Sequence, residues 1–84
     1  MICTVTWLPL AEAKLINLWL GAPDRRAVSA AANNLDILLR TDADQLGESR
    51  ADDVRVLIEG VLGIYYRVKV DDRLVEVLNV WRIV

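Results

Sequence analysis

The sequence has no histidine and only one cysteine among its 84 residues. Without these side chains it lacks the ligands of a zinc site, a Ser-His pair and a Cys-His pair. The single thiol, Cys3, cannot form an internal disulfide, which fits a reducing compartment. Because Cys3 lies among residues typical of a strand, we expect it to be a small core side chain. These absences exclude much of enzyme chemistry, and we expect no metal and no cofactor.

Long apolar runs and an excess of positive charge are missing as well. The longest uninterrupted apolar run, "GVLGIYY", is far shorter than the roughly 20 residues needed to cross a bilayer. The opening "MICTVTWLPL" lacks the positive charge and the long apolar stretch of a signal peptide. The net charge is −2, so nucleic-acid binding would need a local cluster of arginines. We therefore expect a cytoplasmic protein that does not associate with membranes.

The first half of the sequence predicts a strand and two helices. Residues 2–7, "ICTVTW", alternate and are rich in β-branched side chains, which favours a strand. A helix is expected from Pro9, which suits a first helical turn, until "GAP" at residues 21–23 ends it. Asp24 is placed to cap a second, amphipathic helix that runs to about Arg40. The alanines early in that helix would let the two helices approach closely, as in a helical hairpin.

The second half predicts a loop and three strands. Residues 41–49, "TDADQLGES", are expected to form a polar loop. Three strands follow, at roughly 54–59, 64–70 and 74–83, with Asp71-Asp72 in the last turn. The order β-α-α-β-β-β predicts an α+β protein in which a helical hairpin packs on one face of a small antiparallel sheet. We expect one domain that covers the whole chain.

The three last strands carry more apolar surface than two helices can cover. Each has one apolar side: Val54, Val56 and Ile58 in the first; Ile64, Tyr66, Val68 and Val70 in the second; Val75, Val77, Trp81 and Ile83 in the third. The third strand also carries Leu74, Leu78 and Val80 on its other side. Burial of one such side chain is worth about 1.5–3 kcal/mol. One interpretation is that a partner chain closes the second face of the sheet, and the alternative is ordinary packing within the domain.

Several segments of the chain occur in an order and spacing that resemble a known family. They are Trp7-Leu8-Pro9 after the first strand, "AEAKLINLW", an Ala/Leu-rich second helix, "LGESR", "VRVLIEGVLGIYYRV" and "VEVLNVWR". Over nearly its whole length the sequence is similar to the RelE/ParE superfamily, the toxins of type II toxin–antitoxin modules, which include plasmid stabilisation toxins. The resemblance implies a small cytosolic growth inhibitor that is neutralised by an antitoxin protein. It also implies one of two targets, namely mRNA on the ribosome or DNA gyrase.

The resemblance and the strand pattern together suggest site residues. In the nuclease branch, basic residues with a carboxylate, histidine or tyrosine activate the ribose 2′-hydroxyl and stabilise the charge on the phosphate. Catalytic candidates here are Arg55, Arg67, Arg82 and Tyr65. Binding candidates are Arg50, Lys69, Tyr66 and Trp81. The motif tyrosine of the family aligns with Tyr66, whereas strand alternation places Tyr65 beside Arg67.

The sequence also departs from both branches of the family. Gly63 stands three residues before Tyr66, where an arginine is common, and no histidine or tyrosine follows the last strand. The gyrase branch usually has a basic C-terminal tail, and here Arg82 is followed only by two apolar residues. An alternative interpretation of each arginine is an ordinary solvated charge on the surface. A third interpretation is therefore a non-catalytic module that homodimerises, or binds a partner peptide, through the open sheet face.

Overall fold

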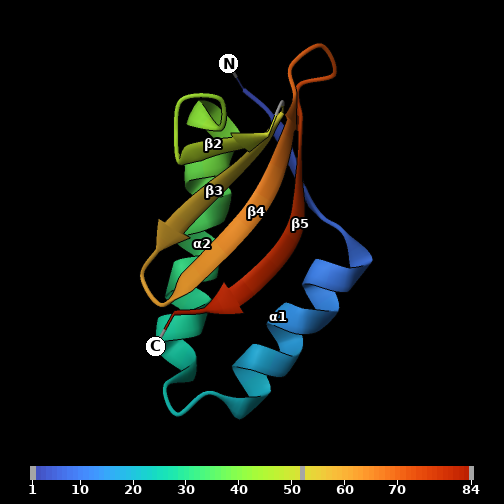
Figure 1. The fold of residues 1–84 in the computed structure, drawn as a ribbon. Helices are drawn as coiled ribbons and strands as arrows, with labels where there is room; N and C mark the ends of the chain where they lie inside the picture. Colours follow the sequence, from blue (N-terminus) through green and yellow to red (C-terminus); the bar gives the residue numbers. More distant parts are fainter. Residues whose placement is uncertain (1, 52, 84) are drawn as a thin grey trace.

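The fold consists of two helices and one five-stranded sheet (Figure 1). The structure is a computed structural model that describes residues 2–51 and 53–83. Its elements are β1 (Thr4–Trp7), α1 (Pro9–Gly21), α2 (Arg25–Asp42), β2 (Glu48–Ala51), β3 (Val54–Glu59), β4 (Leu62–Lys69) and β5 (Leu74–Arg82). The strand order is β1-β5-β4-β3-β2, and all neighbours are antiparallel except β1 and β5. Figure 1 shows that a short turn joins α1 to α2 and that the helices diverge from it. The predicted α+β class is confirmed.

The helix ends follow the local signals in the sequence. Pro9 occupies the first turn of α1, where its missing N–H removes no helical hydrogen bond. The Asp24 carboxylate accepts hydrogen bonds from the backbone amides of Arg26 and Ala27, as expected of an N-cap. The helix that Asp24 begins ends at Asp42, two residues beyond the predicted end at Arg40. The start of α2 thus follows from side-chain capping by Asp24, whereas the start of α1 has no side-chain cap and follows from Pro9.

The expected polar loop at residues 41–49 was only partly correct. Its last two residues belong to β2, which pairs with β3 and lies at the edge of the sheet. All four residues of β2 are exposed, so no buried face imposes an apolar alternation on "ESRA". Gly47 precedes this strand with φ +68°, and a Cβ there would collide with the carbonyl oxygen of Val56. The absence of a side chain at Gly47 lets β2 reach β3.

The core lies between the helices and one face of the sheet. α1 packs chiefly against β5, whereas α2 spans β1, β3 and β4. The buried stripe of α2 consists of Val28, Ala31, Leu35 and Leu39. It meets the buried strand residues Leu62, Ile64, Tyr66, Val68, Val75, Val77 and Val80. Cys3 is buried in the same cluster, as predicted.

The apolar side of β3 faces away from this core, contrary to expectation. Val56 lies opposite Tyr65, and Ile58 lies opposite Gly63. Directly opposed residues of an antiparallel pair share a face, and Tyr65 is on the exposed side of β4. Val54, Val56 and Ile58 therefore belong to the uncovered face of the sheet, and Ile58 is 60% exposed. The prediction that all three strands turn their apolar sides to one layer is wrong for β3.

A β-bulge corrects the predicted faces of β5. Tyr65 pairs with Asn79 and Tyr66 pairs with Val77, so Leu78 is an extra residue with no partner on β4. Beyond the bulge the alternation resumes one residue out of step. Val80 is consequently buried together with Val77, while Trp81 lies on the uncovered side opposite Gly63. The sequence-based assignment had placed Val80 and Trp81 on the reverse faces.

Candidate functional site

One face of the sheet has no helix over it, and we call it the open sheet face. Its residues come from three strands: Val54, Val56 and Ile58 of β3; Gly63, Tyr65, Arg67 and Lys69 of β4; and Leu74, Glu76 and Trp81 of β5. The apolar residues gather where β3, β4 and the end of β5 meet. The charged residues lie toward the β4–β5 turn. The surplus apolar surface inferred from the sequence is therefore real, although different residues supply part of it.

The apolar end of the open sheet face centres on Trp81. A Cβ at Gly63 would lie 2.5 Å from Cε2 of Trp81, so the indole lies directly over this glycine. The Tyr65 ring packs beside the indole, with ring centroids 5.0 Å apart and planes tilted by 50°. Tilted aromatic pairs of this kind are favourable. The absence of a side chain at Gly63 thus provides the space for Trp81.

The charged end of the open sheet face is balanced. Lys69 Nζ lies 3.3 Å from Glu76 Oε1, and Arg67 Nη1 lies 3.7 Å from the same oxygen. Arg67 Nε is also 3.6 Å from Asp53 Oδ2. Glu76 Oε1 is inaccessible to solvent and has no hydrogen-bond donor, so these two cations compensate its charge. Two cations thus meet two carboxylates, and this end attracts a phosphate backbone only weakly.

Arg55 and Tyr66 lie on the helix side of the sheet, opposite each other on β3 and β4. The Tyr66 hydroxyl lies within hydrogen-bonding distance of the carbonyl oxygens of Ala43, at 2.9 Å, and Leu46, at 2.8 Å. Arg55 donates from Nε to the Leu46 oxygen and from Nη2 to the Gly47 oxygen, at 2.6 and 3.3 Å. Both side chains therefore hold the connection between α2 and β2, which we call the 43–47 loop.

The environment of Tyr66 keeps its phenol neutral. Burial raises the pKa of Tyr66 above its usual value of 10.0, and the carboxylate of Asp44 adds to the rise. The hydrogen bond and positive charge of Arg55 lower this pKa in part. The Tyr66 hydroxyl is thus protonated at neutral pH, and its proton is directed at backbone carbonyls.

The remaining predicted site residues lie elsewhere. Arg50 is on β2, 3.5 Å from Glu48, and both side chains are largely exposed. Arg82 is opposite Leu62, at the far end of β5 from Glu76. The predicted set is thus divided between the open sheet face, the 43–47 loop, the β2 edge and the end of β5. The structure brings three pairs of them together, namely Arg67 with Lys69, Tyr65 with Trp81, and Arg55 with Tyr66. The proposed roles of these residues stay predictions.

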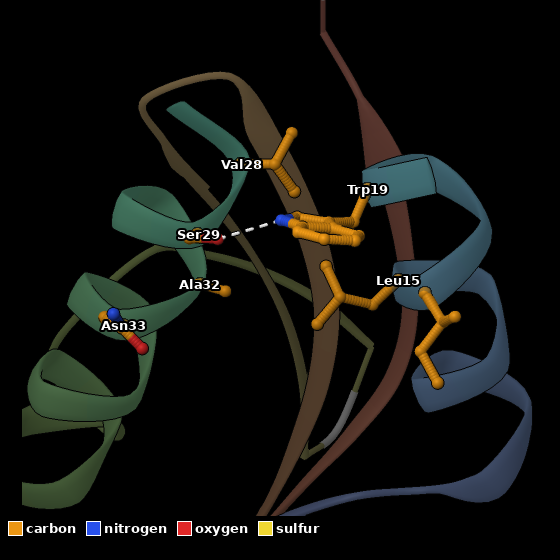
Figure 2. Close-up of a pocket in the computed structure, with 7 residues that line it drawn as sticks. Leu15, Trp19, Val28, Ser29, Ala32 and Asn33 are labelled. Atoms are coloured by element: carbon orange, nitrogen blue, oxygen red, sulfur yellow. Dashed lines mark hydrogen bonds between the residues drawn. The ribbon is translucent and has the colours of Figure 1, made fainter. Parts of the chain in front are cut away.

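A second uncovered surface, which sequence reasoning missed, lies between the helices. We call it the interhelical groove (Figure 2). One part is a pocket of about 330 Å³ lined by Leu15, Ile16, Trp19, Val28, Ser29, Ala32 and Asn33. The adjoining part, about 520 Å³, is lined by Val5, Thr6, Trp7, Glu12, Leu15, Ala32, Asn33 and Asp36. The apolar spacing of α1 and the small side chains of α2 were signals for it, but they were interpreted as close helix packing.

Two tryptophans, Trp7 and Trp19, pack against the core and form walls of the interhelical groove. Trp19 Nε1 donates to Ser29 Oγ at 3.0 Å, as Figure 2 shows, and the Arg25 guanidinium lies 4.5 Å from the Trp19 ring centroid. Trp7 Nε1 donates to Asp36 Oδ1 at 3.0 Å. These bonds link α1 and β1 to α2 and fix the orientation of both indoles. The groove is therefore a preformed feature.

Two kinds of site are not found in residues 2–51 and 53–83. Histidine, cysteine, aspartate and glutamate side chains nowhere gather there in a group of three that could hold a metal ion. Neither helix is long and apolar enough to span a membrane.

Comparison with solved structures identifies the fold. The chain matches a chain of the crystal structure of the toxin–antitoxin complex RelBE2 from Mycobacterium tuberculosis with a TM-score of 0.80 and 18% identity, over 98% of this chain and 92% of that one. It matches a chain of the chromosomal ParDE toxin–antitoxin system from P. aeruginosa with a TM-score of 0.72 and 17% identity, over 99% and 98%. The chain has the RelE/ParE toxin fold. At these identities the likeness establishes the fold.

Comparison of the sequence with protein-family models and with curated proteins gave no match. The RelE/ParE fold is therefore supported by the order and spacing of the sequence segments and by the structure. The fold predicted by the resemblance is confirmed. The first of these structures is a toxin–antitoxin complex, and the second belongs to a toxin–antitoxin system.

Proposed function

We propose that this protein is the toxin-like component of a type II toxin–antitoxin module: a cytoplasmic growth inhibitor that an antitoxin chain neutralises. One observation carries the proposal, namely the match to the RelBE2 structure over 98% of the chain. The surface of the protein supports it. Both the open sheet face and the interhelical groove expose apolar side chains, among them Ile58 and Ile16, which an antitoxin would cover.

Of the two activities that the resemblance implies, we favour action on a protein target such as DNA gyrase over mRNA cleavage. Cleavage needs unoccupied donors that converge on a phosphate. Here Arg55 and Tyr66 bond the 43–47 loop, and Arg67 is paired with Asp53 and Glu76. The apolar end of the open sheet face is suited to a protein surface, because its Trp81 and Tyr65 side chains are typical interface anchors.

Controlled expression in a bacterial host tests the proposal. Induction should arrest growth, and co-expression of the protein encoded by the adjacent reading frame should restore it. During arrest we expect intact transcripts and a DNA-damage response. Transcripts cut at ribosomal positions would instead establish the nuclease activity. In that case Arg67→Ala, which removes a partly exposed guanidinium without disturbing the 43–47 loop, should abolish cleavage.

The competing function is a non-catalytic module of the same fold that homodimerises through the open sheet face. The observation in its favour is the charge balance among Asp53, Arg67, Lys69 and Glu76, which would let two copies of this face meet without net repulsion. Harmless expression, unchanged by the adjacent gene, together with a stable dimer would establish this function in place of the toxin.

A further inference from the structure

Glu76 lies beneath the two cations of the open sheet face. Its side chain is 17% exposed, against 38% for Arg67 and 41% for Lys69. Arg67 is directly opposite Glu76 across β4 and β5, and Lys69 follows Arg67 on the same side of β4. Because Glu76 Oε1 is inaccessible to solvent and accepts no hydrogen bond, its charge is compensated by these cations alone. The carboxylate therefore neutralises both cations where a ligand would meet them.

An aromatic pair lies next to these cations on the same face. Tyr65, Arg67 and Lys69 follow one another at every second residue of β4, so neighbours among them are about 7 Å apart. Tyr65 in turn packs against Trp81. Sites for single-stranded nucleic acid combine the same two kinds of group, because bases stack on aromatic rings while the phosphates meet cations. The open sheet face has both kinds, but its cations are balanced by carboxylates.

We propose that Glu76 is a specificity-determining residue: it excludes single-stranded nucleic acid from the open sheet face and leaves the surface of Tyr65 and Trp81 to a protein. This inference rests on the proposed function, since it concerns the face that we assign to the target, and it adds the residue that selects the class of target. A phosphate could bind the two cations only by drawing them from Glu76, whose shielded charge would then be uncompensated. An apolar side chain of a protein target leaves these ion pairs intact.

The variant Glu76→Gln tests the proposal, because it removes the charge and nearly preserves the shape of the side chain. Fluorescence anisotropy measures the affinity for a labelled oligouridylate of about 12 nucleotides. The variant should bind about tenfold more tightly than the wild type at about 50 mM NaCl, and this gain should fall to about fourfold at about 200 mM, because the released cations add a phosphate contact. The matched control is Asp42→Asn, at the end of α2 on the helix side of the sheet. It changes net charge equally and should give no gain.

Further variants show whether the gain uses the groups named here. Glu76→Gln/Lys69→Gln restores the net charge of the wild type and should lose most of the gain. Glu76→Gln/Tyr65→Leu should bind less tightly than Glu76→Gln, because a base loses its stacking partner. Thermal unfolding checks that each variant is folded. If Glu76→Gln does not fold, Asp53→Asn serves in its place: it frees Arg67 from a half-exposed carboxylate and should give a smaller gain in the same direction.

The outcomes separate this inference from the proposed function. A wild-type protein that binds the oligouridylate as tightly as Glu76→Gln would overturn the role of Glu76, while growth arrest and rescue still stand. A gain of equal size in Asp42→Asn, or one that persists without Lys69, has the same meaning. Failure of arrest and rescue overturns the proposed function, whereas a gain confined to Glu76→Gln would remain a property of the open sheet face.

Discussion

Arg55 and Tyr66 share one hydrogen-bond acceptor: Arg55 Nε lies 2.6 Å and the Tyr66 hydroxyl 2.8 Å from the carbonyl oxygen of Leu46. The two residues face each other across β3 and β4 and reach the 43–47 loop from the helix side of the sheet. Sequence resemblance suggested a catalytic role for Arg55 and a binding role for Tyr66. In this chain both side chains form hydrogen bonds with backbone carbonyls of the 43–47 loop. The two positions therefore have a structural role here.

Removal of these donors should destabilise the protein in a coupled manner. We expect Tyr66→Phe and Arg55→Ala each to lower the free energy of unfolding by about 1–2 kcal/mol, because buried or partly buried carbonyls lose their donors. The double variant should lose more than the sum of the two single losses, since either donor alone still satisfies the Leu46 carbonyl and only the double variant leaves it without a donor. Urea unfolding of the four proteins measures the cycle. Tyr65→Phe, in which the removed hydroxyl is on the open sheet face, is the control and should be neutral. Additive losses would show that the two donors act independently.

Tyr66 should also make the protein sensitive to alkali. Its pKa is raised in the folded state by burial, so the folded protein holds this proton more tightly than the unfolded chain does. The stabilisation is fully present below the usual pKa of 10.0 and is lost as the pH rises from there through the folded-state pKa. Unfolding free energies measured from pH 8 to 11 should therefore decline less steeply in Tyr66→Phe than in the wild type. Equal slopes of the unfolding free energy against pH in the two proteins would contradict the raised pKa of Tyr66.

The close approach of Gly63 and Trp81 predicts a conditional effect of one methyl group. Gly63→Ala should cost about 1–3 kcal/mol of stability, because its Cβ would overlap the indole and force the ring to move. The same substitution in a Trp81→Ala background should be nearly neutral. Gly21→Ala, where no atom lies within 4 Å of the added Cβ, is the matched control. Thermal unfolding measures stability, and tryptophan fluorescence follows the ring. A loss that persists without Trp81 would point to backbone strain.

The bulge in β5 predicts an unusual tolerance to deletion. Without Leu78, the strand alternates regularly from Val75 through Val77 and Val80 toward the core, so the faces are preserved. We expect the Leu78 deletion to fold with a modest loss of stability from the missing half-buried side chain. Deletion of Glu76 changes the alternation of Val77 and Val80 relative to Val75, so the three side chains no longer all face the core. This deletion should prevent folding. Circular dichroism and thermal unfolding compare the two, and equal damage by both deletions would contradict the register.

Much of the fold was predictable because its signals are local. Asp24 caps its helix through two backbone amides, and Pro9 marks the start of the other, so the helix starts followed from single residues. The faces of the strands were harder to predict. The alternation in β3 distinguishes its two sides but does not show which side meets the helices. The side that carries Arg55 meets them, because carbonyls of the 43–47 loop accept the hydrogen bonds of this arginine. No glycine or proline marks the bulge at Leu78.

The candidate site was less predictable than the fold. The sequence showed that apolar surface exceeds what two helices can cover, and Ile58 at 60% exposure is a clear instance. Strand alternation also placed Tyr65 and Arg67 on one side of their strand, as the structure has them, but the compensation of Arg67 and Lys69 by Glu76 depends on a cross-strand register. The interhelical groove depends on the divergence of the helices, whereas the apolar spacing of α1 and the small side chains of α2 fit close helix packing equally well.

The mass of the protein in solution tests most directly whether a different chain covers its exposed surfaces. Light scattering is measured on the purified protein alone and after addition of the protein encoded by the adjacent reading frame. We predict a monomer of 9.4 kDa that is converted to a larger, stable complex by the second protein. A stable homodimer that the second protein leaves unchanged would contradict the toxin–antitoxin proposal and favour the non-catalytic module.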